Sequence, residues 1–436
     1  MRRHFGCIGL GLLLIAGAVH GQVSNVWWDP GATASTNGGG AGTWNFTTNQ
    51  WFNGTSMMAW TNHGNLRAIF GGPSGGTVTI ASGLIVFADS LVFNTPGYNI
   101  AGGGVRRVTL SSGVIEANAD ATITTAITNP TVGPLVGIIK TGLGRLTFAM
   151  SNNFFLGGLT VSGGSLVLLD KDQIGAAGGS VTVNGGALEL LGVQSVSART
   201  LWLGDNGGTL HLPGAADQWS FNDVRGTNGT LTKTGPGTLI IFGPGTNGAS
   251  RVGGTVVNGG ELRINTTTAP GLGIGPLTVN AGGTLAGSGL VGGPVTVHGT
   301  IAPGAGGVGT LTLQDDLSFS SGAQLTFELN QPGVVGGGVN DWINVAGDLV
   351  LDGTLNIVGL ANFGLGTYTL ITYGGTLTDN GLTIGNLSGN ATPAFHYQIQ
   401  AGSGTVNLLV VPEPGTLTLG ALGALAGMWM RRRARF

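Results

Sequence analysis

The sequence predicts an all-β chain coiled into a β-solenoid, and two repeated patterns carry this prediction. A strand pattern, K-T-G-x-G-x-L, occurs in residues 140–148 and again in 233–241. A second pattern, G-x-x-V-x-x-G-x-L, follows each copy, and looser forms recur downstream. Val161 and Val183 are 22 residues apart, as are Val257 and Val279, whereas Val297 follows 18 residues later. Short Val/Leu/Thr strands with glycine turns at this interval bury their apolar side only by stacking on copies of themselves.

Composition excludes several other protein classes. Glycine accounts for 86 of the 436 residues without a G-X-Y period, so collagen is excluded. Hydrophobic residues at 41% and charged residues at 8% oppose disorder. Six of the 17 basic residues lie at the two ends, which leaves the middle of the chain acidic and nucleic acid an unexpected partner. The only cysteine is Cys7, so the body has neither a disulfide nor a thiolate metal site.

Residues 1–21 have the pattern of a signal peptide. Arg2 and Arg3 precede an apolar run, 5–15, and Ala16-Gly17-Ala18 is a cleavage signal. The run is short for a transmembrane anchor, which is the alternative. Export by the general secretion machinery and cleavage by signal peptidase are therefore expected.

Residues 22–104 are predicted to form an N-terminal cap and the first rungs. They contain five of the nine tryptophans, Trp27, Trp28, Trp44, Trp51 and Trp60. Flat indole faces can bind sugars, which is one interpretation. The favoured one is a cap, because the end of a solenoid exposes apolar side chains and unpaired strand edges. Regular strands are expected from residue 77.

The body is divided into repeat-bearing β-helix rungs at 105–330 and C-terminal rungs at 331–410. Rungs of roughly 20 residues give about 19 rungs and a rod near 90 Å at about 4.8 Å per strand. Within the best repeat, alternation places Val257 in the core and Glu261 on the surface.

The C-terminal segment 411–436 has three parts. Pro412, Glu413 and Pro414 precede an almost uncharged run, 415–430, and then the basic residues Arg431, Arg432, Arg433 and Arg435. An apolar run followed by arginines predicts a single transmembrane segment whose arginines stay in the cytoplasm. A permanent anchor is the alternative to a signal that is removed.

These residues carry two family resemblances. The K-T-G-x-G-x-L and G-x-x-V-x-x-G-x-L patterns resemble the autotransporter-associated β-strand repeat, with the clearest copies at 138–169 and 229–264. That resemblance implies a right-handed parallel β-helix at the surface of a two-membrane bacterium. The tail resembles the PEP-CTERM sorting signal, which implies that a membrane-embedded exosortase recognises Pro412-Glu413-Pro414 and removes the tail.

No catalytic residue, metal ligand or cofactor site is predicted. The acidic pairs Asp170/Asp172 and Asp315/Asp316 are expected to be solvated turns. The body histidines are scattered without metal-ligand spacing: His63, His211, His298 and His396. Asn184, Asn258 and Asn280 share one repeat position and are expected to be turn residues that accept left-handed φ or stack their amides.

The sequence therefore predicts a non-enzymatic, exported structural or adhesive protein. It would pass through the inner membrane to the cell surface or extracellular matrix. The alternative is a polysaccharide-binding or polysaccharide-cleaving β-helix. Clustered charges on one face of the coil would favour that alternative, and a bare Ser/Thr/Asn/Gly face would favour the structural role.

Overall fold

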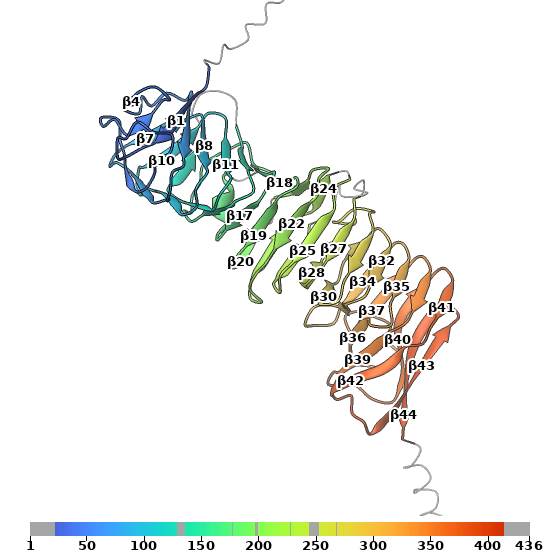
Figure 1. Cartoon of the computed structure of the whole chain (residues 1–436). Helices are drawn as coiled ribbons and strands as arrows, with labels where there is room; N and C mark the ends of the chain where they lie inside the picture. The colour runs from blue at the N-terminus through green and yellow to red at the C-terminus, as the bar shows by residue number, and fades with distance from the viewer. Residues whose placement is uncertain are drawn as a thin grey trace, which may run out of the picture.

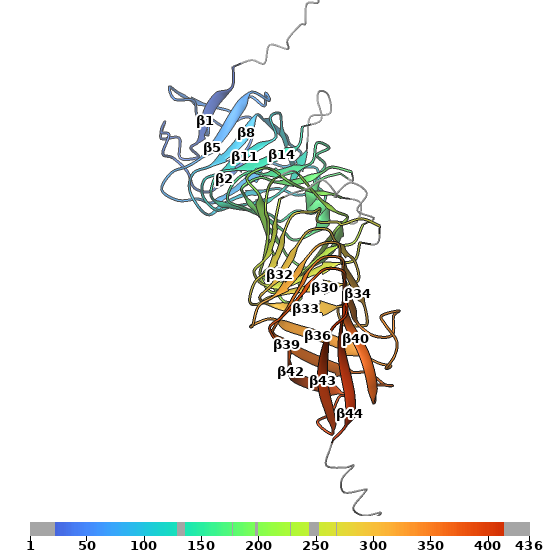
Figure 2. The same cartoon turned by 90° about the vertical axis from the view of Figure 1, so that its right-hand side faces the viewer.

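The computed structural model describes residues 22–128, 136–176, 178–196, 199–226, 228–243, 253–266 and 268–413. Within them the chain forms an elongated coil with its first strands at one end and its last strands at the other (Figure 1). A view from the side shows successive strands stacked along the long axis (Figure 2). The predicted signal peptide and the tail from Pro414 onward lie outside these residues.

The coil has three faces, and the strands within a face pair in parallel except at the two ends of the coil. Face 1 begins as an eleven-stranded sheet and continues as a six-stranded sheet. Face 2 is one fifteen-stranded sheet, and face 3 is a three-stranded sheet followed by a nine-stranded sheet. The predicted parallel solenoid is confirmed, whereas the right hand of the coil stays a prediction.

Face 1 takes its strands from the whole length of the chain. In spatial order, its eleven-stranded sheet contains β24 (Val224–Gly226), β21 (Leu201–Leu203), β18 (Val181–Val183), β16 (Leu159–Val161), β14 (Ile138–Thr141), β11 (Val114–Ala117), β8 (Ser90–Phe93), β5 (Leu66–Phe70), β1 (Ser24–Trp28), β3 (Trp51–Phe52) and β4 (Met57–Met58). Its six-stranded sheet contains β31 (Leu290–Val291), β34 (Thr310–Leu313), β37 (Trp342–Val345), β40 (Gly366–Tyr373), β44 (Thr405–Pro412) and β43 (Phe395–Gly402).

Face 2 contains, again in spatial order, β2 (Gly42–Trp44), β6 (Thr77–Ile80), β9 (Tyr98–Ala101), β12 (Ala121–Thr124), β15 (Arg145–Phe148), β17 (Ser165–Leu168), β19 (Ala187–Leu190), β22 (Gly208–His211), β25 (Leu231–Thr234), β27 (Thr255–Val257), β29 (Leu277–Val279), β32 (Val295–Val297), β35 (Leu317–Phe319), β38 (Leu349–Leu351) and β41 (Leu377–Asp379). Face 3 contains β13 (Ala126–Thr128), β10 (Arg107–Leu110) and β7 (Ile85–Ala88), then β20 (Val193–Val196), β23 (Gln218–Phe221), β26 (Thr238–Ile241), β28 (Gly260–Ile264), β30 (Gly283–Gly287), β33 (Thr300–Pro303), β36 (Gln324–Leu329), β39 (Thr354–Gly359) and β42 (Thr383–Gly389).

Alternate residues point into the coil and form columns of apolar side chains. On face 2, Leu146, Leu166, Leu188 and Leu210 are in register on successive strands and are 0% exposed. Strands about 4.8 Å apart bring such side chains into direct contact, so each coil buries its interior against the next.

The two tested positions of the best repeat differ in outcome. Val257 is in register with Val279 and is 0% exposed, which confirms its predicted place in the core. Glu261 was predicted to be exposed, but its side chain is only 25% exposed and pairs with Arg263 at 2.5 Å. That prediction is wrong because residues two apart on a strand share a face, and the long arginine side chain covers the carboxylate.

The two K-T-G copies occupy different corners of the coil. The first copy places β14 on face 1 and β15 on face 2. The second copy places β25 on face 2 and β26 on face 3. The motif therefore specifies two strands and the corner between them, while the rest of each coil varies in length.

The corner of each copy requires a glycine. Gly142 and Gly235 both have φ of +76°, a region that other residues rarely adopt. A Cβ atom would lie 2.4 Å from the carbonyl oxygen of Ala117 at Gly142 and 2.2 Å from that of Leu212 at Gly235. Any side chain at these positions would therefore strain the backbone and clash with the preceding coil.

A buried lysine closes the corner of the first copy. The Nζ atom of Lys140 donates to the carbonyl oxygens of Gly142, Gly144 and Gly163 at 2.7, 2.6 and 2.8 Å. Gly163 belongs to the next coil, so one ammonium group ties two successive corners together. These carbonyl groups would otherwise lack donors in a corner where regular strand pairing is interrupted.

The second copy repeats the arrangement with Lys233. Its Nζ atom donates to the carbonyl oxygens of Thr234, Gly235 and Gly259 at 3.1, 2.8 and 2.9 Å. Both lysines are 0% exposed. Burial lowers the pKa of each to about 8, and the negative charges of Asp120 near Lys140 and Glu261 near Lys233 oppose this shift. Both ammonium groups are therefore protonated at neutral pH.

Tryptophans fill the N-terminal end of the coil. Trp28, Trp44, Trp51 and Trp60 are at most 1% exposed, and Trp27 is half-buried. The ring centroids of Trp44, Trp51 and Trp60 are 4.8–4.9 Å apart. Buried indoles leave no ring face for a sugar, so this arrangement favours the cap over the carbohydrate platform.

The C-terminal end differs from the predicted run of rungs over 331–410. The parallel coil continues to β42, after which β43 and β44 form a hairpin that pairs antiparallel with β40. Apolar alternation is the same in parallel and antiparallel strands, so the pattern alone does not separate them. The hairpin signal is the two-residue turn of Ser403 and Gly404, whose φ angles are 52° and 80°.

The coil has fewer and longer turns than the sequence predicts. Face 2 has 15 strands, and 13 steps lead from Thr77 to Leu377, or about 23 residues per step. At about 4.8 Å per step, face 2 is about 67 Å long. The predicted 19 rungs and 90 Å are wrong because the loops beyond the repeated corner motif are long and carry no repeated pattern.

Helix is almost absent from the described residues. A single 3₁₀ turn, η1 (Lys171–Ile174), occurs there. None of these residues belongs to a helix long and apolar enough to cross a membrane. The predicted span, 415–430, lies outside the described ranges.

Val183→Asp should lower the free energy of unfolding by several kcal/mol, about the cost of an unpaired buried charge. Val183 is 0% exposed and stacks between Val161 and Leu203. The neighbouring Thr182 points outward, so Thr182→Asp is the matched control and should change stability by less than about 1 kcal/mol. Urea unfolding followed by circular dichroism measures both, and equal losses would contradict the inward–outward assignment.

Lys140→Met and Lys233→Met should each lower the free energy of unfolding by about 3 kcal/mol, because three corner carbonyls lose their donor. Lys171→Met is the control and should leave stability nearly unchanged, since the Lys171–Asp172 pair is exposed to solvent. Thermal melts of the three variants test this. Unchanged melting of both core variants would show that the carbonyls find other donors.

Candidate functional site

The predicted processing residues lie where the folded body ends. Pro412 is the last residue of β44 and is in register with Phe395 on β43. Glu413 follows directly and is exposed. Pro414 and the arginines Arg431, Arg432, Arg433 and Arg435 lie outside the described residues. An enzyme that reads Pro-Glu-Pro would therefore meet its target at the C-terminal end of the coil, beside the hairpin.

The outer surface of face 2 carries a row without charge over its second half. Successive strands from β25 to β41 place these residues in register: Thr232, Val256, Thr278, Thr296, Ser318, Val350 and Thr378. All are half-buried or exposed. This ridge of hydroxyl and methyl groups contains no carboxylate, imidazole or amine, the groups that most often transfer protons at neutral pH.

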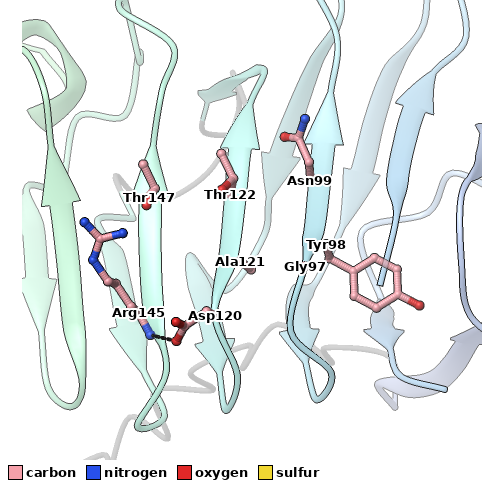
Figure 3. A pocket seen from close by; sticks show the side chains of 8 residues that line it. All are labelled: Gly97, Tyr98, Asn99, Asp120, Ala121, Thr122, Arg145 and Thr147. Carbon is pink, nitrogen blue, oxygen red and sulfur yellow. Dashed lines mark hydrogen bonds between the residues drawn. The ribbon is translucent and has the colours of Figure 1, made fainter. Parts of the chain in front are cut away.

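The first half of face 2 carries a shallow depression with an open volume of about 190 Å³. It is lined by Gly97, Tyr98, Asn99, Asp120, Ala121, Thr122, Arg145 and Thr147. Asn99, Thr122 and Thr147 stand side by side on three strands (Figure 3). Tyr98 points away from them, is 1% exposed, and donates its hydroxyl hydrogen to the carbonyl of Gly71 at 2.6 Å.

The charged groups of the depression, Asp120 and Arg145, form hydrogen bonds or ion pairs with other groups of the protein. The carboxylate of Asp120 accepts the backbone N–H of Arg145 at 2.8 Å. The guanidinium of Arg145 binds both oxygens of Glu189 at 2.7 and 2.8 Å, and this hydrogen bonding holds the pKa of Glu189 below its usual value. Asp120 is the only carboxylate among the lining residues, so the depression lacks the paired acids of a glycosidase.

The Arg145–Glu189 pair covers an apolar residue on the outside of the coil. Arg145 is on β15 and Glu189 is on β19, and the strand between them places Val167 in register with Glu189. Val167 points outward but is only 1% exposed. A surface ion pair contributes little by its charge, so its effect here comes mainly from covering this valine.

The same arrangement occurs on face 1. Arg67 on β5 pairs with Glu116 on β11, and β8 lies between them with Val92 in register with Glu116. Val92 is 3% exposed. Serine precedes the covered valine by two residues in both cases and is in register with the arginine. These two arginine–glutamate pairs are structural features of the coil.

One buried carboxyl has a strongly shifted pKa. Burial raises the pKa of Asp341 to about 7, although hydrogen bonds from the backbone N–H groups of Glu328 and Gly309 oppose the shift. Those bonds measure 2.6 and 2.7 Å and occupy both carboxyl oxygens. Asp341 is 1% exposed, so it fastens a loop to the coil and cannot meet a substrate.

The other candidate residues do not assemble into a catalytic or metal site. Asp170 caps the 3₁₀ turn and Asp172 lies inside it, while Asp316 accepts the backbone N–H of Asp348 at 2.7 Å. Across the described ranges, no group of three or more His, Asp or Glu side chains could hold a metal ion. His211 lies 3.0 Å from the hydroxyl of Thr234, and His63, His298 and His396 are exposed.

The repeat asparagines stack as predicted at one pair of coils. The amide of Asn280 donates to that of Asn258 at 2.7 Å, whereas Asn184 accepts the backbone N–H of Asn206 at 3.1 Å. None of the three has a positive φ, so the expectation of left-handed φ is wrong. They are structural residues at the corners.

Trp202 is a surface feature that composition and motif analysis did not reveal. It is 40% exposed and lies on face 1 in register with Thr182 and Arg225. The guanidinium of Arg225 sits 5.8 Å from the indole centroid and is held at 2.9 Å by Asp223, which is 0% exposed. The L-W-L alternation of β21 is the signal that could have placed this ring outside.

Two family models match the chain. The passenger-associated-transport-repeat matches residues 138–168 and 231–264. These are the two corner units closed by the buried lysines. The PEP-CTERM protein-sorting motif matches residues 410–434 and includes Pro412, Glu413 and Pro414.

The chain spans only a small part of the length of the curated relatives that it matches. The chain is 47% identical over 117 residues to the adhesin BmaC autotransporter of Brucella suis biovar 1 (strain 1330), which covers 26% of this chain and 3% of that protein. It is 39% identical over 118 residues to an extracellular serine protease of Serratia marcescens, over 27% of this chain and 10% of that protein. A second extracellular serine protease of that organism is 40% identical over 118 residues.

The similarity to a protease does not extend to a visible serine–histidine site. Within the described residues no serine side chain is hydrogen-bonded to a histidine. The chain carries autotransporter-associated repeats in a parallel β-coil and a PEP-CTERM protein-sorting motif at its C-terminal end.

Proposed function

We propose that this protein is a non-enzymatic, structural or adhesive rod of the cell surface or extracellular matrix. The observation that carries the proposal is the uncharged hydroxyl ridge of face 2, from Thr232 to Thr378. A long row of outward side chains without acids, bases or metal ligands suits contact with other surfaces. The adhesin similarity supports an adhesive role.

Sorting would proceed in three steps. Signal peptidase removes residues 1–21 during export by the general secretion machinery. The C-terminal span holds the chain in the inner membrane while an exosortase-type enzyme reads Pro412-Glu413-Pro414. Removal of the tail then releases the rod to the cell surface. The exposure of Glu413 directly after β44 supports this order, because the target residue is accessible without unfolding the hairpin.

A second candidate, polysaccharide binding without cleavage, is favoured by Trp202. A tryptophan that is 40% exposed presents apolar surface to which the apolar face of a sugar ring can bind. Arg225 fixes the ring from the neighbouring strand, and Asp223 fixes Arg225. The contact is preorganised, which lowers the entropy cost of binding.

Glu413→Ala should leave the full-length protein in the inner membrane with its tail intact, because the residue between the two prolines is the one chemically distinct group of the motif. Asp379→Ala is the control, an exposed acid at the same end of the coil. Cell fractionation and mass spectrometry of the released protein measure this. A released wild-type protein that still ends at Phe436 would refute processing.

Trp202→Ala should reduce retention on extracellular polysaccharide from the organism that produces the protein at least about tenfold. This is the usual effect of removing an aromatic side chain that becomes buried on binding. Thr182→Ala, on the adjacent strand in register, should bind as the wild type does. Affinity electrophoresis gives both values. Equal retention of the two variants would remove Trp202 as a glycan contact while leaving the structural role untouched.

A further inference from the structure

The C-terminal end of face 1 is a long edge strand. β43 is the last strand of its six-stranded sheet and pairs along all eight residues with β44 on its inner side. By contrast, the two strands that end face 2, β2 and β41, have three residues each. A strand of eight residues whose outer side is unpaired is a template for another strand.

This edge has none of the features that usually prevent pairing. Residues 395–402 read F-H-Y-Q-I-Q-A-G and contain neither proline nor a charged Lys, Arg, Asp or Glu. The register between β43 and β44 is unbroken, so no bulge bends the edge away. The other long terminal strand, β42, has a register shift beside it where it pairs with β39.

The turn geometry shows which backbone groups face outward. A two-residue turn with positive φ at Ser403 and Gly404 closes on a hydrogen-bonded pair, here Gly402 and Thr405. Hydrogen-bonded and non-hydrogen-bonded pairs then alternate along the antiparallel ladder. Pro412, which has no N–H group, falls opposite Phe395 at a non-hydrogen-bonded pair, as this alternation requires.

The outward groups are therefore those of Phe395, Tyr397, Ile399 and Ala401. The N–H of Phe395 bonds the carbonyl of Thr392 at 3.2 Å within its own turn. Within the described residues, no strand pairs with the outer side of β43 at Tyr397, Ile399 or Ala401. Their side chains are half-buried, whereas those of His396, Gln398 and Gln400 are exposed.

We propose that β43 pairs with β43 of a second copy of this chain, antiparallel about a twofold axis through Gln398. This register places Tyr397 opposite Ile399 of the second copy, and both have outward backbone groups. His396 then faces Gln400, so polar side chains meet polar ones on one side of the new sheet. On the other side the large Phe395 meets the small Ala401.

A second copy of this chain fits the edge better than an unrelated strand does. Antiparallel pairing about a twofold axis makes the strand complementary to itself, and β43 has no Lys, Arg, Asp or Glu to repel its copy. Head-to-tail stacking is blocked because buried tryptophans and the two-residue strands β3 and β4 close the opposite end. Pairing would join two rods at their C-terminal ends into one continuous sheet.

Gln398→Cys tests the axis directly in the full-length chain. The two Gln398 residues would be a non-hydrogen-bonded pair, whose closely spaced Cβ atoms suit a disulfide. Cys7, the natural chain's single cysteine, is replaced by serine in both cysteine variants, so mild oxidation of Gln398→Cys should give a disulfide-linked dimer on a non-reducing gel. Gln400→Cys is the control and should stay monomeric, because its copy would lie four residues along the strand, or about 13 Å away.

Charge variants at the same position supply an independent measurement. Gln398→Lys and Gln398→Glu should each raise the dimer dissociation constant at least about tenfold in sedimentation of the detergent-solubilised chain, because like charges meet at the axis. Mixing the lysine and glutamate variants should restore a one-to-one dimer, because opposite charges then meet at the axis. Gln398 is exposed, so unchanged thermal melting of each variant shows that the fold is intact.

Three results would overturn the proposal. One is a wild-type chain that stays monomeric at concentrations up to about 100 μM, well above typical dissociation constants of specific pairs. Another is cross-linking of Gln400→Cys at least as strong as that of Gln398→Cys. The last is cross-linking of Gln398→Cys to a different protein in cells, which would assign the edge to a foreign strand.

Discussion

Each coil of this protein is held by the coils on either side of it, through parallel backbone pairing at a spacing of about 4.8 Å. Such close stacking constrains where charge can be placed. Inside the corners, the ammonium groups of Lys140 and Lys233 each have three carbonyl acceptors. Outside, Arg67 and Arg145 reach across a strand to a glutamate and cover an outward valine. In both places a long basic side chain links different coils: the lysines join adjacent coils, and the arginines join coils separated by one strand.

The surface of the coil and its ends have different roles. The middle of face 2 offers hydroxyl and methyl groups, and the depression near Arg145 has its charges paired within the fold. At the C-terminal end, Glu413 of the protein-sorting motif follows β44 beside the open edge of β43. The ends of the coil therefore differ from its regular middle, where each coil contacts only its neighbours.

The sequence predicts the parts of the fold that depend on local alternation. Val183, Val257 and Leu188 point inward as their strands indicate, and glycine marks the corners. The same alternation also points Lys233 inward, in line with Leu231, but lysine is so rarely buried that the signal is easily dismissed. That both copies of the motif carry lysine at this position was the available clue.

What the sequence did not predict depends on register between distant residues. Arg145 and Glu189 are 44 residues apart, and only the stacking of coils brings them together. The burial of Asp341 depends likewise on a loop that bends back to β36, and the number of coils depends on loops with no repeated pattern. At the candidate processing site, the sequence identifies Pro412 and Glu413, but only the structure shows how closely the hairpin approaches them.

The occurrence of the lysine-closed corner at two different positions around the coil bears on how such proteins grow. The same corner unit connects faces 1 and 2 in one copy and faces 2 and 3 in the other. Its position around the coil is therefore not fixed by the rest of the rod. Duplication or loss of a unit would therefore leave every remaining coil stacked between two neighbours and would change only the length of the rod. Rod length becomes a property that evolution can adjust in steps of one coil, which agrees with relatives of which this chain spans 3% and 10%.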